Sequence, residues 1–400
     1  MRRIEVLHLV SELAHGGTER LLYDLLTRVD PDTYRMTIVT TSGADAPEVR
    51  HRFEAAGLHT HHLPLGLAAH AGRGLRGRHL LPKLAALRQL WAFLRCTRPD
   101  IVHTHGAANN FYGPLAARLG GVPHIMTHDH NPVAGGRRDR LAVNLAAGFS
   151  DIAFVASRTV GTARRALLCW RPERVVHLPN GIDVEHFRPP TAAERRRARQ
   201  RFGLPADAYV AGAVGRLVPF KRHDLLVEAL PLLLAEVPGA HLLLVGEGPE
   251  RSALVERARR LGVGARLHLA GWQPEPVHAY WALDTLAMPS DAQEGFGLAV
   301  AEAMACGLPV VARRCPLFAE VAGDRAARLV PPAAPAIAAS LAALAGSAPE
   351  RDRLGAQARR HAERHFDVGL GASLLESIYS QCLAGDRRRQ SAQQELLRTS

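Results

Sequence analysis

Short apolar runs rich in valine, isoleucine and leucine alternate with helical periodicity along most of the chain. Such alternation is typical of parallel βαβ units, in which helices cover both faces of a central sheet. In the first half the pattern predicts strands at Ile4–Val10, Arg35–Thr40, His59–Leu63, Asp100–Thr104, His124–Thr127, Asp151–Ala156 and Arg174–Leu178. In the second half it predicts strands at Tyr209–Val214, Ala240–Val245, Arg266–Ala270, Thr285–Met288, Val310–Ala312 and Ala326–Val330. Helices are expected between them, for instance at Glu19–Val29, Leu84–Arg95, Asn110–Leu119 and from Pro349 to about Leu383.

A segment dense in turn-forming residues, Pro179–Pro190, separates the two series of strands. We therefore expect an α/β fold of two doubly wound, Rossmann-like domains, residues 1–185 and 186–370. A C-terminal helix and polar tail, residues 371–400, is expected to pack back toward the first domain. Ligands of such folds bind outside the carboxyl ends of the strands, so the sequence predicts a site in a cleft between the two domains.

The composition of the chain excludes several classes of protein. With 400 residues, 47% hydrophobic and 22% charged, the chain is long enough for two folded domains and is not disordered. Its five cysteines are widely spaced and include no C-x-x-C pair, which excludes a disulfide scaffold and a cysteine zinc site. The sequence shows neither a signal segment nor an apolar stretch long enough to span a membrane, so we expect a cytoplasmic protein.

The formal net charge is +12, and seven basic residues between Arg73 and Arg98 stand without an acid among them. Beside them lies an apolar helical stripe that includes Leu90 and Leu94. Such a segment could lie on an anionic membrane surface, on the inner face of the cytoplasmic membrane. In the alternative interpretation the stripe packs on the sheet and the arginines face water. Aromatic content of only 5% and the lack of a nucleic-acid motif argue against a nucleic-acid partner.

Two loops that follow predicted strands could hold phosphate. Gly16 and Gly17 precede a helix, where backbone N–H groups and the positive helix end can approach an anion. Arg216 and Lys221 stand five residues apart in the loop after the first strand of the second domain, and together they suit a diphosphate. Lys221 is one of only two lysines in the chain.

The most specific segment is E-G-F-G-L-A-V-A-E, from Glu294 to Glu302. Glu294 lies in a glycine-rich loop, and Gly297 opens a small, apolar helix that carries Glu302. A buried carboxylate needs a partner, and ligand hydroxyls would provide one for both acids. The start of the helix would hold a phosphate.

Histidines cluster after two neighbouring strands. His103-Thr104-His105 places two imidazoles on one face of a strand end, and His128 and His130 end the next strand. With 21 histidines in the chain, part of this clustering can arise by chance. A His-x-His pair can also bind a metal, but the sequence offers no convincing complete ligand set.

Taken together, these segments resemble glycosyltransferase family 4, the retaining GT-B enzymes that use nucleotide-sugar donors. The resemblance covers residues 4–380 and rests on the ordered set G-G-T-E-R, H-T-H-G, L-P-N-G-I-D, G-R-L-V-P-F-K, L-L-V-G-E-G-P and E-G-F-G-L-A-V-A-E. It implies a GT-B fold with two Rossmann-like domains facing each other across a deep cleft. It also implies a metal-independent reaction, since no metal-binding D-x-D pair stands out.

Carried over residue by residue, the resemblance implies that Arg216 and Lys221 neutralise the donor diphosphate. Glu294 would bind hydroxyls of the donor sugar, and Glu302 would hold the ribose. The backbone amides that help to fix sugar and phosphate would come from Phe296, Gly297 and Leu298.

In the first domain, Gly16 and Gly17 would close over the diphosphate and sugar. His128 would lie near the sugar and the acceptor, with His105 a weaker acceptor-side candidate. Gly246 would shape the nucleotide side of the cleft, and the loop Gly271–Gln273 would frame the base.

The resemblance implies transfer of a hexose, with UDP preferred over GDP, to a hydroxyl of a lipid-linked or growing polysaccharide. No cofactor and no metal is expected, because the nucleotide sugar is a substrate. Two other enzyme classes stay open on the sequence alone. One is a nucleotide-sugar epimerase of the GT-B fold; the other is a metal-dependent hydrolase that uses His103, His105 and His128.

Overall fold

The computed structural model describes residues 2–14, 16–43, 45–66, 80–131, 144, 147–167, 172–291, 293–323 and 325–385. The chain forms two compact units. The first contains the residues up to Gly181 and those from Val368 onward, and the second runs without interruption from Ile182 to Asp367.

The first unit is built on a parallel sheet of seven described strands in the order β3-β2-β1-β4-β5-β6-β7. The strands are β1 (Ile4–Val10), β2 (Tyr34–Thr40), β3 (His59–His62), β4 (Ile101–His105), β5 (His124–Asp129), β6 (Ile152–Val155) and β7 (Val175–His177). The order reverses between β1 and β4, which pair directly, so the loops after these two strands lie at the point where doubly wound folds bind ligands.

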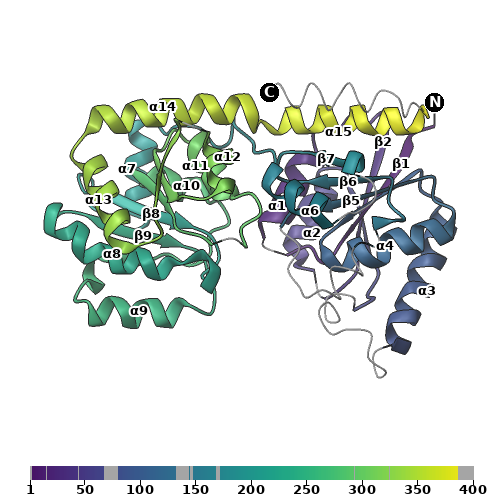
Figure 1. Ribbon diagram of the computed structural model, residues 1–400, viewed down its shortest axis with the longest axis horizontal. Helices are drawn as coiled ribbons and strands as arrows, with labels where there is room; N and C mark the ends of the chain where they lie inside the picture. The colour runs from purple at the N-terminus through teal and green to yellow at the C-terminus, as the bar shows by residue number, and fades with distance from the viewer. Residues whose placement is uncertain are drawn as a thin grey trace. The chain divides into compact units, whose positions relative to one another are not determined.

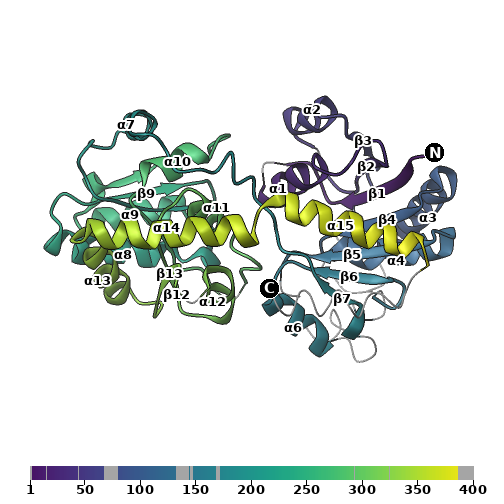
Figure 2. The ribbon, with the colours of Figure 1, turned by 90° about the horizontal axis from the view of Figure 1, so that it is seen from above.

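Helices cover both faces of this sheet. They are α1 (Gly17–Leu26), α2 (Pro47–Ala55), α3 (Leu80–Thr97), α4 (Ala107–Gly120), α6 (Arg158–Leu167) and α15 (Val368–Leu383). Side chains of α1 and α15 share one core with one face of the sheet, and α3 and α4 pack on the opposite face. Figure 1 shows α15 on one side of the sheet and α3 on the other, and Figure 2 shows α15 running across the strands.

The second unit repeats the design with six described strands in the order β10-β9-β8-β11-β12-β13. The strands are β8 (Val210–Val214), β9 (His241–Val245), β10 (Leu267–Leu269), β11 (Thr285–Met288), β12 (Val310–Arg313) and β13 (Ala327–Val330). The helices are α7 (Ala192–Arg201), α8 (His223–Glu236), α9 (Arg251–Arg260), α10 (Val277–Ala282), α11 (Leu298–Ala305), α12 (Pro316–Ala322), α13 (Ala334–Ala345) and α14 (Ala348–His365). Here the order reverses between β8 and β11. Figure 1 shows α8 and α9 on one side of this sheet and α14 on the other.

The expected fold is confirmed. Each predicted strand is present, with ends that differ by at most two residues. The helices differ more from the pattern. Helices α3 and α4 extend beyond both predicted ends, and Pro82 falls in the first turn of α3, where proline is tolerated. Helix α1 ends at Leu26 instead of Val29, and the helix predicted from Pro349 to about Leu383 is two helices, α14 and α15.

The basic segment Arg73–Arg98 is only partly described, since residues 67–79 lie outside the described residues, as do residues 386–400 of the polar tail. Within α3, Leu90 and Leu94 are buried in the core. This part of the stripe therefore packs against its own unit, as in the alternative interpretation, whereas Leu84, near the start of α3 and a member of the same stripe, is 51% exposed. Across the described part of the chain, no helix has the length and apolar character needed to cross a membrane.

Candidate functional site

In the second unit, the loops after β8 and β11 bring together the predicted residues Lys221 and Glu294. The Nζ atom of Lys221 lies 2.6 Å from Oε2 of Glu294, and each side chain is 12% exposed. The two loops are also joined by a backbone hydrogen bond of 2.8 Å from the Asp291 N–H to the Phe220 carbonyl. An ammonium and a carboxylate thus lie at the switch point of the sheet.

Glycines allow the neighbouring loops to approach this pair. Gly215 has a positive φ, and a Cβ there would lie 3.7 Å from Nζ of Lys221. Gly246, at the end of β9, also has a positive φ, and a Cβ there would collide with the Gly215 carbonyl oxygen. Its N–H donates to the Gly271 carbonyl at 2.8 Å, while the Gly215 N–H donates to the Val245 carbonyl at 2.8 Å. Gly246 is therefore required for the packing of the loops after β8, β9 and β10.

Glu302 lies in α11, whose residues from Ala299 to Ala305 are all buried. Its carboxylate is 8% exposed and accepts a hydrogen bond of 2.5 Å from the hydroxyl of Tyr280, which is fully buried in α10. The expectation that ligand hydroxyls supply the partners of both acids is thus incomplete. The chain itself provides Lys221 for Glu294 and Tyr280 for Glu302.

The loop before α11 fixes the start of that helix. Gly297 adopts a left-handed conformation with φ +83°, and a Cβ on it would lie 2.9 Å from Cε1 of Phe318. Phe296 is buried and packs edge-on against Phe366, with ring centroids 5.3 Å apart. The N–H groups of Val300 and Ala301 donate to the Gly297 carbonyl at 2.8 and 3.3 Å. The first two N–H groups of the helix, those of Leu298 and Ala299, are the ones that can face an anion.

Arg216 projects from the same loop as Lys221 and is exposed. Among the described residues its side chain has no hydrogen-bond or ion-pair partner. The site in the second unit thus contains one free guanidinium, one paired ammonium and two carboxylates. Such a set can bind a diphosphate and several hydroxyl groups.

In the first unit, the predicted residues lie after β1, β4 and β5. Gly16 caps the start of α1 in an extended conformation, and a Cβ on it would collide with the Glu19 carboxylate, which folds back over the helix start. His105 is the last residue of β4, and its register partner in β5 is His128. Gly16, Gly17, His105 and His128 therefore lie at the carboxyl ends of neighbouring strands, near the β1/β4 switch point.

The structure extends the histidine cluster beyond what the sequence indicates. His8, in β1, is fully buried, and its Nδ1 lies 3.0 Å from Nε2 of His105. The Nδ1 of His105 in turn lies 3.1 Å from Nε2 of His130. The Nδ1 of His103 lies 2.8 Å from the hydroxyl of Tyr379, which comes from α15.

Burial keeps these imidazoles neutral. Loss of hydration lowers the pKa of His8 to about 3 and that of His130 to about 4. The pKa values of His103, His105 and His128 also fall well below the usual value, chiefly through burial and further through neighbouring histidines. Sequence reasoning missed His8, because a single histidine in an apolar strand gives no signal of its neighbours in the sheet.

A second buried polar group adjoins His128 on the other face of the sheet. Asp129 lies 3.1 Å, through Oδ2, from Nε of Arg164, whose side chain is only 1% exposed. Asn110 donates to Asp129 Oδ1 at 2.9 Å and to the His128 carbonyl at 3.0 Å. Burial raises the pKa of Asp129, and Arg164 opposes that shift. This network fixes the backbone that carries His128.

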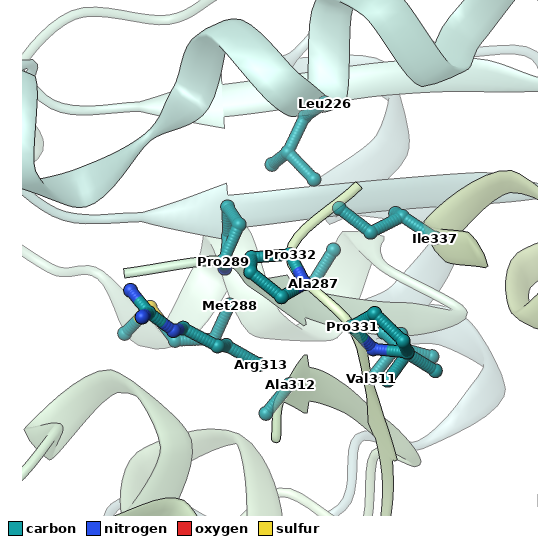
Figure 3. Close-up of a pocket in the computed structure, with 11 residues that line it drawn as sticks. Leu226, Ala287, Met288, Pro289, Val311, Ala312, Arg313, Pro331, Pro332 and Ile337 are labelled. Atoms are coloured by element: carbon teal, nitrogen blue, oxygen red, sulfur yellow. The ribbon is translucent and has the colours of Figure 1, made fainter. Parts of the chain in front are cut away.

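Figure 3 shows a pocket at the ends of β11, β12 and β13. Its described lining is mostly apolar and includes Leu226, Met288 and Ile337, with Arg313 as the charged member. None of the predicted site residues belongs to that lining. The pocket therefore adds nothing to the chemistry of the site.

Comparisons with known proteins agree with this arrangement. Residues 15–186 match the family model "Glycosyltransferase Family 4", and residues 194–361 match "Glycosyl transferases group 1". A "D-inositol 3-phosphate glycosyltransferase" of Streptomyces bingchenggensis is 31% identical over an alignment of 428 positions, which covers 98% of this chain and 91% of the relative.

A "GDP-mannose-dependent alpha-(1-6)-phosphatidylinositol monomannoside mannosyltransferase" of Mycolicibacterium smegmatis is 37% identical over 218 residues. That match covers 50% of this chain and 55% of the relative. Among solved structures, Anabaena Alr3699/HepE in complex with UDP-glucose superposes with a TM-score of 0.81 at 21% identity, covering 95% of this chain and 100% of that one. This likeness shows the fold. With the two family matches and a relative aligned over nearly the whole chain, the protein belongs to glycosyltransferase family 4 and is a glycosyltransferase of the GT-B fold.

Proposed function

We propose that the protein transfers a hexose from a nucleoside diphosphate sugar to a hydroxyl acceptor, with retention of the anomeric configuration and without a metal ion. The observation that carries the proposal is the Lys221–Glu294 pair, with Nζ and Oε2 2.6 Å apart, at the switch point of the second sheet. One cation for the diphosphate and one carboxylate for the sugar are thereby held side by side.

The diphosphate gains negative charge as its bond to the sugar breaks, and fixed positive charge stabilises that change. Arg216 offers a guanidinium fork that has no partner among the described residues. Lys221 has three N–H donors, so it can keep its ion pair with Glu294 and still donate to a phosphate oxygen. We assign these two side chains to the leaving group.

The remaining roles follow the same geometry. Glu294 would accept hydrogen bonds from the donor sugar, and Glu302, oriented by Tyr280, would accept one from the ribose. The amides of Phe296, Gly297 and Leu298 would bind the sugar and a phosphate, and Gly246 would keep the nucleotide loops close. Gly16 and Gly17 would bind the diphosphate from the first unit.

In the transfer step, the acceptor oxygen forms a bond to the anomeric carbon while the bond from that carbon to the diphosphate oxygen breaks. The acceptor proton passes to the departing diphosphate oxygen on the same face, which accounts for retention. His128 is neutral and would donate or accept a hydrogen bond near the sugar without carrying charge. His105, with its ring nitrogens 3.0 Å from His8 and 3.1 Å from His130, would act on the acceptor side by holding His130 in place.

For the nucleotide base of the donor and for the acceptor, we propose only a chemical class. The Anabaena structure contains UDP-glucose, whereas the mycolicibacterial relative, at 37% identity, is named for GDP-mannose. We therefore propose a GDP-linked donor ahead of the UDP-linked donor expected from the sequence. The relatives named above act on inositol 3-phosphate or on a phosphatidylinositol mannoside. A phosphorylated or lipid-linked polyhydroxy acceptor is consistent with these names, and exposed Arg88 and Arg95 on α3 could contact an anionic membrane surface.

Calorimetry of the purified protein with UDP, GDP and their sugar conjugates, in the presence of a chelator, tests the donor site. We expect one nucleotide series to bind, with weaker binding in Lys221→Ala and Glu302→Ala and unchanged binding in Arg260→Ala on α9. Incubation with that donor and a panel of inositol phosphates, lipid-linked sugars and oligosaccharides should give a glycoside of unchanged anomeric configuration. Product without acceptor would indicate an epimerase, and no nucleotide binding by folded protein would contradict the proposal.

A further inference from the structure

We propose that His105, His128 and His130 form a binding site for a divalent transition-metal ion such as Zn²⁺ at the ends of β4 and β5. One ring nitrogen of each lies within 4.8 Å of the others. The rings of His128 and His130 are stacked with centroids 4.0 Å apart, and those of His105 and His130 with centroids 5.4 Å apart.

The spacing of the nitrogens suits a shared ion. A tetrahedral Zn²⁺ with Zn–N bonds of about 2.0–2.1 Å places its ligand nitrogens about 3.4 Å apart. Nδ1 of His105 and Nε2 of His130 are 3.1 Å apart, close to that spacing, and they face each other as in a hydrogen bond. Binding therefore requires both rings to turn so that their lone pairs converge on the ion, which replaces that hydrogen bond. His128 would supply the third ligand.

The polar atoms of His128 point to a missing ligand. Its side chain is 2% exposed, yet both ring nitrogens are buried without a hydrogen-bond partner among the described residues. Buried polar atoms of native proteins are paired in the great majority of cases. An ion bound to one nitrogen of His128 would give a partner to one of these two unpaired atoms.

A supporting residue is in place behind the ligands. When His105 binds an ion through Nδ1, its proton is on Nε2, which lies 3.0 Å from Nδ1 of His8. His8 can accept that proton in a hydrogen bond and so hold the ring in the ligating orientation, as outer-shell partners of metal-bound histidines do. His103 is not a member of this set. Its Nδ1 lies 2.8 Å from the Tyr379 hydroxyl, and its Nε2 is buried without a hydrogen-bond partner among the described residues.

The alternative set of His8, His103 and His105 also places three nitrogens close together, but all three residues are buried inside the sheet layer. His130 is only partly buried and therefore offers a path for the ion. The two sets share His105, so they compete for its imidazole and we place one ion, not two, in the cluster. The geometry favours the set at the strand ends.

The test is titration of untagged, chelator-treated protein with Zn²⁺ by calorimetry and with Co²⁺ by visible absorption. We expect one ion per chain and tetrahedral Co²⁺ bands. His130→Ala and His128→Ala should each lose at least about 100-fold in affinity, because outer-shell partners alone account for about 10- to 100-fold. His59→Ala, which removes an exposed histidine of β3, is the matched control and should bind like the wild type.

Absence of binding to the wild type, or equal affinity in all four proteins, would overturn the metal site. Far-ultraviolet circular dichroism and a cooperative urea-unfolding transition establish that each variant is folded. If the proposed function holds, Zn²⁺ would occupy His128 and His105 and inhibit transfer, with recovery on chelation. Failure of nucleotide binding would contradict the proposed function alone, since metal binding is measured without a sugar donor.

Discussion

Lys221 Nζ and Glu294 Oε2, from residues 73 positions apart in the chain, meet at 2.6 Å. The contact joins the loop after β8 to the loop before α11 and leaves both side chains largely buried. The two groups are therefore expected to act as one unit in binding and in transfer.

A double-mutant cycle tests this coupling. Lys221→Met removes the charge on the leaving-group side, and Glu294→Gln removes the charge on the sugar side while keeping the shape. Each single change should lower kcat/KM about 100- to 1000-fold, the usual effect of losing one fixed group at a developing charge. The kcat/KM of the double variant should be no lower than that of the more impaired single variant. Losses that add in free energy would show that the two groups act independently.

Tyr280 should matter through Glu302. Tyr280→Phe removes the hydroxyl that donates to the Glu302 carboxylate at 2.5 Å but leaves the ring in place. A hydrogen bond to a charged group contributes about 1.5–3 kcal/mol, so the free energy of unfolding should fall by about that amount. Nucleotide affinity should fall as well, because the carboxylate loses its orientation. Urea unfolding and calorimetry measure the two effects, and Tyr112→Phe, on α4 of the other unit, serves as the control.

Two glycines with positive φ offer a matched comparison. In Gly246→Ala the new Cβ would collide with the Gly215 carbonyl, whereas in Gly262→Ala it would meet open space. The first change should cost about 3 kcal/mol of unfolding free energy and displace the loop that carries Lys221. The second should cost only the backbone strain, about 1 kcal/mol, and leave kcat/KM unchanged. Equal losses of activity in the two variants would contradict this account of the loops.

The buried histidines predict instability in acid. Their pKa values are lower in the folded than in the unfolded protein, so protons bind preferentially to the unfolded chain as the pH falls below 6.5. Each histidine that stays neutral should cost about 1.4 kcal/mol per pH unit in that range, down to about pH 3 for His8 and about pH 4 for His130.

Urea unfolding between pH 7 and pH 5 measures the slope. His8→Asn, whose side-chain amide can occupy the position of Nδ1, should reduce the mean slope over this range by about 1 kcal/mol per pH unit, because an unfolded histidine is only partly protonated above pH 6. An unchanged slope would mean that His8 is not neutral in the folded protein. Far from the cluster, His59→Ala should leave the slope as in the wild type.

The fold could be predicted because local pattern and global topology agree. Apolar runs mark the strands, and a Gly-Gly or Gly-Phe-Gly turn marks the helices that follow β1 and β11. Parallel crossovers place the loops that follow the strands at one and the same edge of the sheet. For the same reason the loops that carry Lys221 and Glu294 could be expected to meet.

The partners of the site residues could not be predicted. Tyr280 and Glu302 lie on different helices, and their contact depends on how α10 packs against α11. His8 joins the histidine cluster only because β1 pairs with β4 in one particular register, with His8 opposite His103. Such contacts depend on how helices pack and on how strands are aligned, and neither can be deduced from a single sequence.

Helix α15 has a consequence for the order in which the protein is made. The core of the first unit includes Val368, Leu375 and Tyr379, which are synthesised after the whole of the second unit. The second unit, residues 182–367, is continuous and needs none of them. During synthesis the second unit can therefore complete its fold before α15 exists, while the part of the first sheet that α15 will cover, beside α1, stays exposed.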